Sequence, residues 1–331
     1  MIQPELLIET TRGSLVETRH YGHVVVSDNK GNIIYQRGDA RYVTYFRSAA
    51  KPIQAMHVVL SGAYNKFMFS KAEISIMCAS HFGEDIHRET VMSILHKIGL
   101  QKEHLQCGAT TSLDVHYALK MALDGYAADV LFNDCSGKHA GFLAVCEVLG
   151  YGLDNYIDFN HPLQNDLLKL IAKMCGVTPE SVVLGVDGCG VPVHGMPLLN
   201  MAQGYASLCN AETFDSDTRF AARTIVQAMG EHPEMLSGTN GFCTALVKAT
   251  HGRLIGKIGA EAVYCVGNTA TGQGLAIKLE DGNLWKLSPV VMQTLEKLKW
   301  LNADEIECLQ SYRVVENRNK HNDIVGYTRA V

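Results

Sequence analysis

The sequence predicts an α+β fold in which strands from both ends of the chain form a central antiparallel sheet and helices pack on it. Short apolar runs broken by turn residues occupy the start of the chain. Apolar residues at helical spacing fill the middle, and strand-like runs return after residue 250. No Pro- or Ser-rich linker divides the sequence, so we expect one domain covering 1–331.

The strands are predicted first at the beginning of the chain. Residues 4–36 contain "LLIETTRG" and "HVVVSDNKGNIIYQRG", and the "DNKGN" between two β-branched runs is typical of a hairpin turn. We expect two to four antiparallel strands there. Near the other end, "GRLIGKIG", "AVYCVGN" and "GLAIKLEDGN" predict further strands that are separated by glycine-containing turns.

The helices are predicted between these two groups of strands. Ile53, Met56 and Leu60 follow helical spacing within 48–61, and Pro52 fits only near the start of that helix. "SKAE", from Ser70 onward, is a capping-box pattern that opens the next helix. Further helices are expected near 86–98, 137–149, 161–175 and 217–229, and a last one near 288–300.

Composition narrows the classes of function. Hydrophobic residues make up 47% of the chain and the net charge is −5, which argues for a globule with a sizeable core and against a nucleic-acid partner. No run of about 18 apolar residues occurs, so no membrane partner is expected. The start does not resemble a signal peptide, which predicts a cytoplasmic protein whose ten cysteines are mostly buried free thiols.

The stretch "FRSAAKPIQA" places Ser48 and Lys51 three residues apart where a helix begins. Residues at this spacing share one face of a helix, and a desolvated neutral lysine can remove the proton of a serine hydroxyl. Ser-x-x-Lys is the nucleophile motif of penicillin-binding proteins and serine β-lactamases. The pattern by itself is weak, because serine and lysine are common, and taken alone it favours a serine that caps the helix and a lysine in solvent.

A second serine–lysine pair is a candidate elsewhere in the chain. Lys257 lies on the predicted strand "GKIG", where those serine enzymes carry Lys-Thr-Gly, and Ser80 follows the helix that opens at Ser70. The "SDN" string at residues 27–29 precedes Ser48 in the chain, which is the wrong order for the third motif of those enzymes. Ser80 and Lys257 therefore interest us only as a pair, since either alone is equally consistent with a structural role.

Two thiols in polar, glycine-rich surroundings differ from core cysteines. "FNDCSGKHAGFLAVC" opens a helix with Cys135 and Lys138 in its first turn, and "GVDGCGVPVHGMPL" is predicted as a glycine-rich loop that holds Cys189. Two thiolates with one or two nitrogen or oxygen ligands suit zinc. Three alternatives remain open here: unrelated free thiols, a nucleophilic Cys135, or a disulfide.

At these strings the sequence resembles the rhizobial-type L-asparaginases, the asparaginase II family. The resemblance is carried by "FRSAAKPIQA", "CASHFGE", "NDCSGKHAGFLA", "DGCGVPVHGMPL" and "KIGAEAVY", and it spans nearly the whole chain. It implies a fold similar to serine β-lactamases and glutaminases, hydrolysis of L-asparagine to L-aspartate and ammonia, and a homodimer. It implies two serine–lysine pairs, Ser48 with Lys51 and Ser80 with Lys257.

The same resemblance implies a zinc site near the catalytic serines, formed by Cys135, Lys138 and Cys189 with water. A lysine can bind the metal only as the neutral amine. His139 and Asp187 are the nearest further candidates, and we expect them to orient ligands or bind substrate rather than to bind the metal directly.

The expected reaction begins with attack of Ser48 on the side-chain amide of L-asparagine. We expect Arg47 to bind the α-carboxylate and Asp187 to bind the α-ammonium group. Two rival functions remain. One is a related serine hydrolase, such as a glutaminase or a β-lactam or D-peptide hydrolase, and the other is a non-catalytic, zinc-stabilised amino-acid-binding protein.

Overall fold

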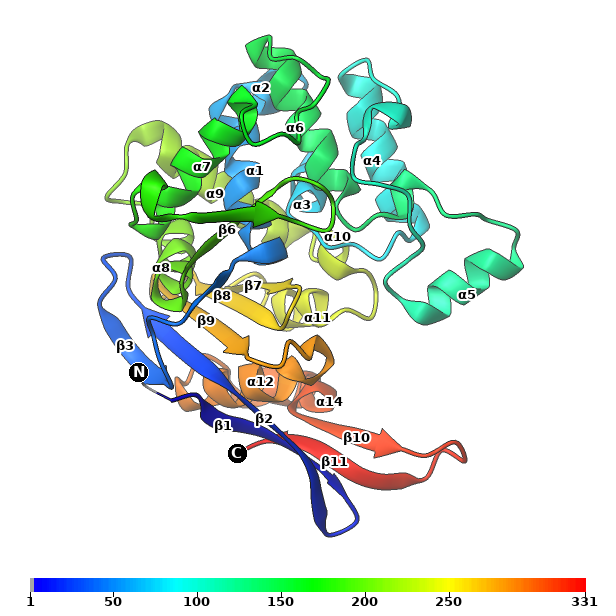
Figure 1. The fold of residues 1–331 in the computed structure, drawn as a ribbon, viewed down its shortest axis with the longest axis vertical. Helices are drawn as coiled ribbons and strands as arrows, with labels where there is room; N and C mark the ends of the chain where they lie inside the picture. The colour runs from blue at the N-terminus through cyan, green and yellow to red at the C-terminus, as the bar shows by residue number, and fades with distance from the viewer. Residues whose placement is uncertain (1–2) are drawn as a thin grey trace.

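The computed structural model describes residues 3–331, and residues 1–2 of the predicted domain lie outside them. Its main sheet has the strand order β10-β11-β1-β2-β9-β8-β7, with β3 paired to β2, and every pairing is antiparallel (Figure 1). The strands are β1 (Glu5–Arg12), β2 (Leu15–Ser27), β3 (Ile33–Arg37), β7 (Leu254–Gly259), β8 (Val263–Asn268), β9 (Gln273–Leu279), β10 (Val314–Arg318) and β11 (Ile324–Ala330).

The two ends of the chain meet in this sheet, which confirms the predicted fold class. β1 pairs with β11, where Ile8 lies opposite Ala330, and β2 pairs with β9, where Val25 lies opposite Ala276. Strands β10 and β11 differ from the prediction, which placed a helix last. Strand β10 lies at the edge of the sheet, and both strands are short and only partly buried, so neither carries the continuous apolar run that marks a buried strand.

A second, smaller sheet lies in the middle of the chain. It has the order β4-β6-β5, from β4 (Val43–Tyr45), β5 (Val183–Val186) and β6 (Pro192–Pro197). The prediction of a glycine-rich loop over 185–198 was therefore only partly right, because β6 occupies its second half. Its sequence, "PVHGMP", contains two prolines and a glycine, which are uncommon within strands, so the sequence pattern did not indicate a strand there.

The predicted helices are all present within a few residues of their expected bounds, and several more occur that the periodicity did not reveal. The helices are α1 (Lys51–Leu60), α2 (Ala63–Lys66), α3 (Lys71–Met77), α4 (Asp85–Lys97), α5 (Val115–Leu123), α6 (Ser136–Leu149), α7 (Pro162–Cys175), α8 (Leu198–Cys209), α9 (Ser216–Glu231), α10 (Glu234–Ser237), α11 (Phe242–Ala249), α12 (Leu287–Lys297), α13 (Ala303–Cys308) and α14 (Gln310–Arg313). None of those in the described chain combines the length and the apolar character needed to cross a bilayer.

The sheet is covered on both faces at its centre. All residues of β8 are buried, and so are all residues of β9 except the first. The side chains that point to either face of the sheet are therefore shielded from water in these two strands. Helix α8 lies against β9, β2 and β8, and α12 contacts β11 and β1. Helices α1, α3, α6, α7 and α9 pack on one another above the sheet in Figure 1.

Two local features position the segments that carry the candidate polar residues. The predicted capping box at Ser70 is present, with the Glu73 side chain accepting from the Ser70 N–H, and it fixes the start of α3. A Cβ at Gly259 would lie 2.9 Å from the Phe46 carbonyl oxygen. Glycine there allows β7 to approach the turn that carries Ser48 closely.

Candidate active site

Lys51 lies at the start of α1 with its side chain only 1% exposed. Its ammonium group donates to the Ala79 carbonyl at 2.7 Å, to the Ser80 hydroxyl at 3.1 Å and to the Asp134 carboxylate at 3.1 Å. The segment with Ser80 is held in turn by a 3.0 Å hydrogen bond from its N–H to the Leu236 carbonyl. The lysine predicted to serve Ser48 therefore contacts Ser80.

Lys257 lies on β7, the edge strand of the main sheet, and its side chain is fully buried. It donates to the Ser80 hydroxyl at 2.7 Å and to the Ile258 carbonyl at 2.7 Å. The predicted pairing of Ser80 with Lys257 is thus present as a contact in the structure. The Ser80 oxygen accepts from both lysines, so it forms a bridge between them.

The two buried lysines differ in acidity. Burial lowers the pKa of Lys257 to about 8. Burial acts in the same direction on Lys51 and is the largest single influence, but the charges of Asp134, Cys135 and Cys189 together outweigh it and raise the pKa of Lys51 above its ordinary value. The pKa of Asp134 is lowered in return, because Lys51, His81 and Lys257 together outweigh the effect of burial, which would raise it. At neutral pH, Lys51 is therefore held as a cation, and Lys257 is the lysine that loses its proton first.

Ser48 lies in a single 3-10 turn, Arg47–Ala50, directly before α1. The Phe46 N–H donates to the His194 carbonyl at 2.8 Å, which ties this turn to β6, and Arg47 has φ = 52°, in the left-handed region. Ser48 is half-buried and lines a small hollow together with Arg47, Lys51, Gln54, Lys138, Asp187, Pro192, Val193 and His194. Among the hydrogen bonds of the described residues, none joins Ser48 to Lys51.

Arg47 and Asp187 face each other at this hollow. The guanidinium Nε donates to the Asp187 carboxylate at 2.9 Å, and the two side chains are 23% and 12% exposed. The sequence predicts that these two residues bind the opposite charges of one substrate. In the structure each is the charge partner of the other, so the ion pair leaves neither of these two charges uncompensated.

Cys135, Lys138 and Cys189 lie together at the start of α6. Cys135 is the residue preceding the first turn, and the Lys138 ammonium group donates to the Cys189 sulfur at 2.9 Å. The neighbouring Cys135 thiol and the Lys138 ammonium group hold the pKa of Cys189 well below its usual range, against the effect of burial. Although burial alone would lower it, the pKa of Lys138 is raised, chiefly by Cys189. The structure thus contains a buried thiolate with an ammonium partner.

His139 lies on the next position of α6 and is fully buried. Its Nδ1 is 2.7 Å from the Tyr156 hydroxyl, which already accepts from the Gln106 N–H at 2.8 Å. The Tyr156 hydroxyl therefore donates its proton in a hydrogen bond to Nδ1 of His139. The proton of the neutral imidazole is then on Nε2. Among the described residues, Nε2 has no hydrogen-bond partner, and the charge of Cys189 acts on the ring from nearby. A protonated Nε2 favours a role beside the thiolate over direct metal binding.

The donor set fits zinc in its chemistry, with two thiols and one amine brought together and buried. Within residues 3–331, no three side chains of His, Cys, Asp or Glu are grouped so as to hold a metal ion. The predicted set contains only two residues of those types, because its third member is a lysine.

Three residues at the site were not predicted. Asp134, which holds Lys51, stands immediately before Cys135 in the string "NDCSGKH" and could have been found there as a counter-ion for a buried lysine. Gln54 follows Lys51 by three positions, so helical spacing placed it on the same face. His194 was recognised only as part of a loop, because its strand was missed.

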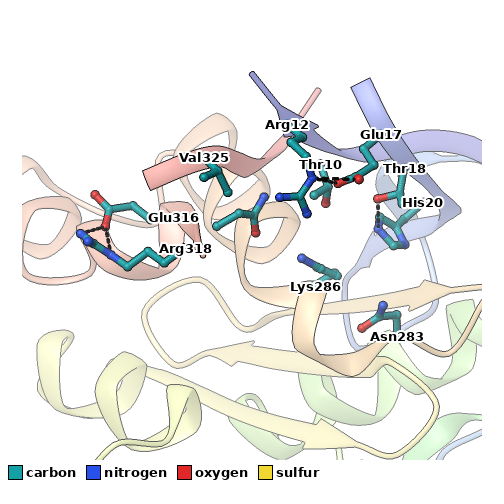
Figure 2. A pocket seen from close by; sticks show the side chains of 11 residues that line it. Thr10, Arg12, Glu17, Thr18, His20, Asn283, Lys286, Glu316, Arg318 and Val325 are labelled. Carbon is teal, nitrogen blue, oxygen red and sulfur yellow. Dashed lines mark hydrogen bonds and ion pairs between the residues drawn. The ribbon is translucent and has the colours of Figure 1, made fainter. Parts of the chain in front are cut away.

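Another hollow, of about 420 Å³, lies at the far end of the main sheet, between the β1–β2 hairpin, the β10–β11 hairpin and the segment before α12 (Figure 2). Its arginines pair with neighbouring glutamates, Arg12 with Glu17 and Arg318 with Glu316. It contains neither a serine nor a cysteine. The hollow at Ser48 is therefore the better candidate for nucleophilic chemistry.

Comparison with known proteins gives one family. The family model described as L-asparaginase II matches residues 8–330, while no curated protein matches the chain. Among solved structures, the chain is similar to a candidate beta-lactamase from Bacteroides dorei DSM 17855, at 12% identity and a TM-score of 0.43, over 83% of this chain and 93% of that one. Since the family model spans almost the whole sequence, the chain belongs to the L-asparaginase II family.

Proposed function

We propose that this protein is an amidohydrolase that converts L-asparagine and water to L-aspartate and ammonia. One observation carries the proposal beyond family membership. A continuous set of polar contacts runs from Lys257 through Ser80 to Lys51 and Asp134, and it reaches a hollow lined by Ser48. A buried chain of proton-exchanging groups beside an accessible hydroxyl is what activation of a serine requires.

We propose Ser48 as the nucleophile, since it lines the hollow and Ser80 does not. Lys51 is cationic at rest and cannot accept a proton. Neutral Lys257 takes a proton from the Ser80 hydroxyl while Lys51 gives one to the Ser80 oxygen, so the charge moves to Lys257. Lys51, now a neutral amine, accepts the hydroxyl proton of Ser48 as its oxygen attacks the carboxamide carbon.

The attack forms a tetrahedral oxyanion, for which we propose the backbone N–H of Ser48 as one donor. When the carbon–nitrogen bond breaks, the leaving nitrogen takes the proton held by Lys51 and departs as ammonia. Water then attacks the Ser48 ester and gives a proton to Lys51, and the product leaves as L-aspartate while Ser48 regains its proton.

Arg47 and Asp187 supply the charges that the two ends of an amino acid need. We propose that the substrate carboxylate replaces Asp187 at Arg47 and that the substrate ammonium group replaces Arg47 at Asp187. Exchange of one ion pair for two leaves no charge unpaired in the hollow. His139 does not contact the substrate in this proposal. Its Nε2 stabilises the thiolate form of Cys189 and so helps to lower the pKa of that thiol.

We propose that Cys135, Lys138 and Cys189 hold zinc, with Lys138 giving up its proton on binding. The ion would supply a positive charge beside the substrate site and would tie α6 to the segment before β6. We further propose a homodimer and a reducing compartment such as the cytoplasm, in which the free thiols persist.

Ammonia release from L-asparagine by wild type and by Ser48→Ala tests the function. We expect the variant to lose at least about a thousandfold in kcat, while Ser14→Ala, at an exposed turn, keeps full activity. Wild-type-like turnover by Ser48→Ala would remove Ser48 as the nucleophile. Glutamine and nitrocefin as substrates distinguish the related hydrolases, and binding of asparagine without ammonia release would indicate a binding protein.

Elemental analysis tests the metal proposal. We expect about one zinc per chain in the wild type and a loss of zinc in Cys135→Ala and Cys189→Ala. Cys146→Ala, a core thiol on the same helix as Lys138, is the matched control and should keep its zinc. A metal-free wild type with full activity would contradict a role for zinc in the reaction.

A further inference from the structure

Two uncharged polar side chains in the hollow at Ser48 have no hydrogen-bond partner among the described residues. Gln54 is 4% exposed and His194 is 1% exposed, and within residues 3–331 neither side chain takes part in a hydrogen bond. The His194 Nε2 is fully shielded from solvent as well. Buried polar groups are almost always hydrogen-bonded, so an unpaired amide and an unpaired imidazole in one hollow need an explanation.

Their positions show what each could reach. Gln54 lies three residues after Lys51 on α1, so its side chain projects from the face that carries the proposed proton acceptor. His194 lies on β6, and the charges of Lys138 and Asp187 both act on its ring. Gln54 therefore belongs to the reacting end of the hollow, and His194 belongs to the end where Asp187 binds Arg47.

We propose that Gln54 and His194 are substrate-recognition residues, with Gln54 pairing to the side-chain carboxamide of asparagine and His194 bonding to its α-amino or α-carboxylate group. This rests on the proposed function. A carboxamide complements another carboxamide, since each offers N–H donors and a carbonyl acceptor. The product carboxylate has no donor for the Gln54 oxygen, so Gln54 favours the substrate over L-aspartate and helps the product to leave.

A structural role predicts the opposite behaviour on substitution. If either side chain stabilised the fold, an apolar replacement would lower the melting temperature. A polar group that is buried without a partner instead costs stability, so replacing it by an apolar side chain keeps or raises the melting temperature while it weakens substrate binding. The combination of unchanged or higher Tm with higher KM is the signature of recognition.

The first test uses Gln54→Met with L-asparagine and with the β-methyl ester of L-aspartate, which has the carbonyl oxygen but no N–H. We expect KM for asparagine to rise at least about tenfold, with kcat much less affected. The preference for amide over ester, measured as the ratio of kcat/KM values, should fall about tenfold, because only the amide loses a hydrogen bond from its N–H. Inhibition by L-aspartate should strengthen relative to substrate binding.

The second test uses His194→Leu and His194→Gln. We expect His194→Leu to raise KM at least about tenfold without lowering Tm, and the glutamine variant to restore part of the affinity through its amide. Gln310→Leu and His116→Gln, at exposed positions, are the controls and should leave KM unchanged.

The outcomes separate this inference from the function on which it rests. A wild type that releases no ammonia contradicts the proposed function itself. An active wild type, with KM and the amide-to-ester ratio unchanged in Gln54→Met and KM unchanged in His194→Leu, overturns the recognition role alone. A fall in Tm with unchanged KM overturns it too, since that result assigns both side chains to the fold.

Discussion

The surroundings of Lys51 and Lys257 invite comparison, because the same side chain is buried in both and both donate to the Ser80 oxygen. Lys51, at the start of a helix, faces the Asp134 carboxylate, and its pKa is raised. Lys257, on an edge strand, donates within residues 3–331 only to the neutral Ser80 hydroxyl and Ile258 carbonyl, and burial lowers its pKa to about 8. Burial by itself thus does not determine the charge of a lysine, because a carboxylate and two thiols near Lys51 together reverse its effect.

This difference in surroundings determines which of the two lysines carries the proton at rest. A proton on Lys51 is stabilised by Asp134, whereas a proton on Lys257 has no carboxylate in direct contact in the described part of the chain. Ser80 lies between the two amines and can carry the proton in either direction. We interpret Lys257 as the acceptor that frees Lys51 for catalysis, and the following predictions would break or sharpen that interpretation.

The largest expected effect concerns removal of either amine. Lys257→Met and Lys51→Met should each lower kcat for ammonia release by about 10³, since the relay needs both groups. Lys248→Met, near the end of α11, is the matched control and should keep its activity. If Lys257→Met retained substantial turnover, Lys51 would not depend on Lys257.

The second effect is on pH dependence. Because Lys257 must be neutral, kcat/KM should rise with pH and level off above a pKa of about 8. Below that pH the rate should fall about tenfold per unit, to roughly a hundredth of the plateau at two units below it. A profile that is flat across this range would contradict the role of Lys257, and the residual activity of Lys257→Met should lack the acidic limb.

A third difference appears in stability. Lys257 has a pKa of about 8 when folded against an ordinary 10.5, so the unfolded chain binds more protons between these pH values. Its contribution therefore destabilises the fold below about 8 and disappears as pH rises toward 10.5. Urea unfolding at pH 7 should show Lys257→Met to be more stable than the wild type by about 1–3 kcal/mol.

Lys51→Met provides the contrast in the same measurement. It should be less stable than the wild type, by about 3 kcal/mol, because it leaves Asp134 without its cation. Equal shifts of the same sign for the two variants would show that the two surroundings do not differ as described.

The smallest effect is expected for Asp134→Asn. Loss of the carboxylate removes the charge that raises the pKa of both lysines, so the acidic limb of kcat/KM should move to lower pH by about one unit. The plateau should fall about tenfold, because Lys51 loses one of its anchors. A limb that stays in place would indicate that Asp134 does not control the pair, and Asp129→Asn, away from the relay, gives the control profile.

The fold was largely predictable from periodicity, but its edges were not. The buried strands β7, β8 and β9 carry apolar runs between glycine turns, and those runs indicated them directly. The strands β10 and β6 escaped prediction because one is polar at a sheet edge and the other is framed by prolines. Sequence patterns report burial, so strands with little apolar signal are hidden from them.

The sequence by itself determined which side chains were candidates for chemistry, because short strings such as "RSAAK" and "NDCSGKH" place serine, lysine and cysteine at the start of helices. It could not determine their partners. Ser80 and Lys257 are 177 positions apart, and Lys51 and Asp134 are 83 apart. Only the packing of β7 against the turn before α1, and of α6 against α1 and α3, decides which amine meets which hydroxyl or carboxylate. Since electrostatic effects on a buried pKa act over a few ångströms, the charge of each lysine is a property of the tertiary structure.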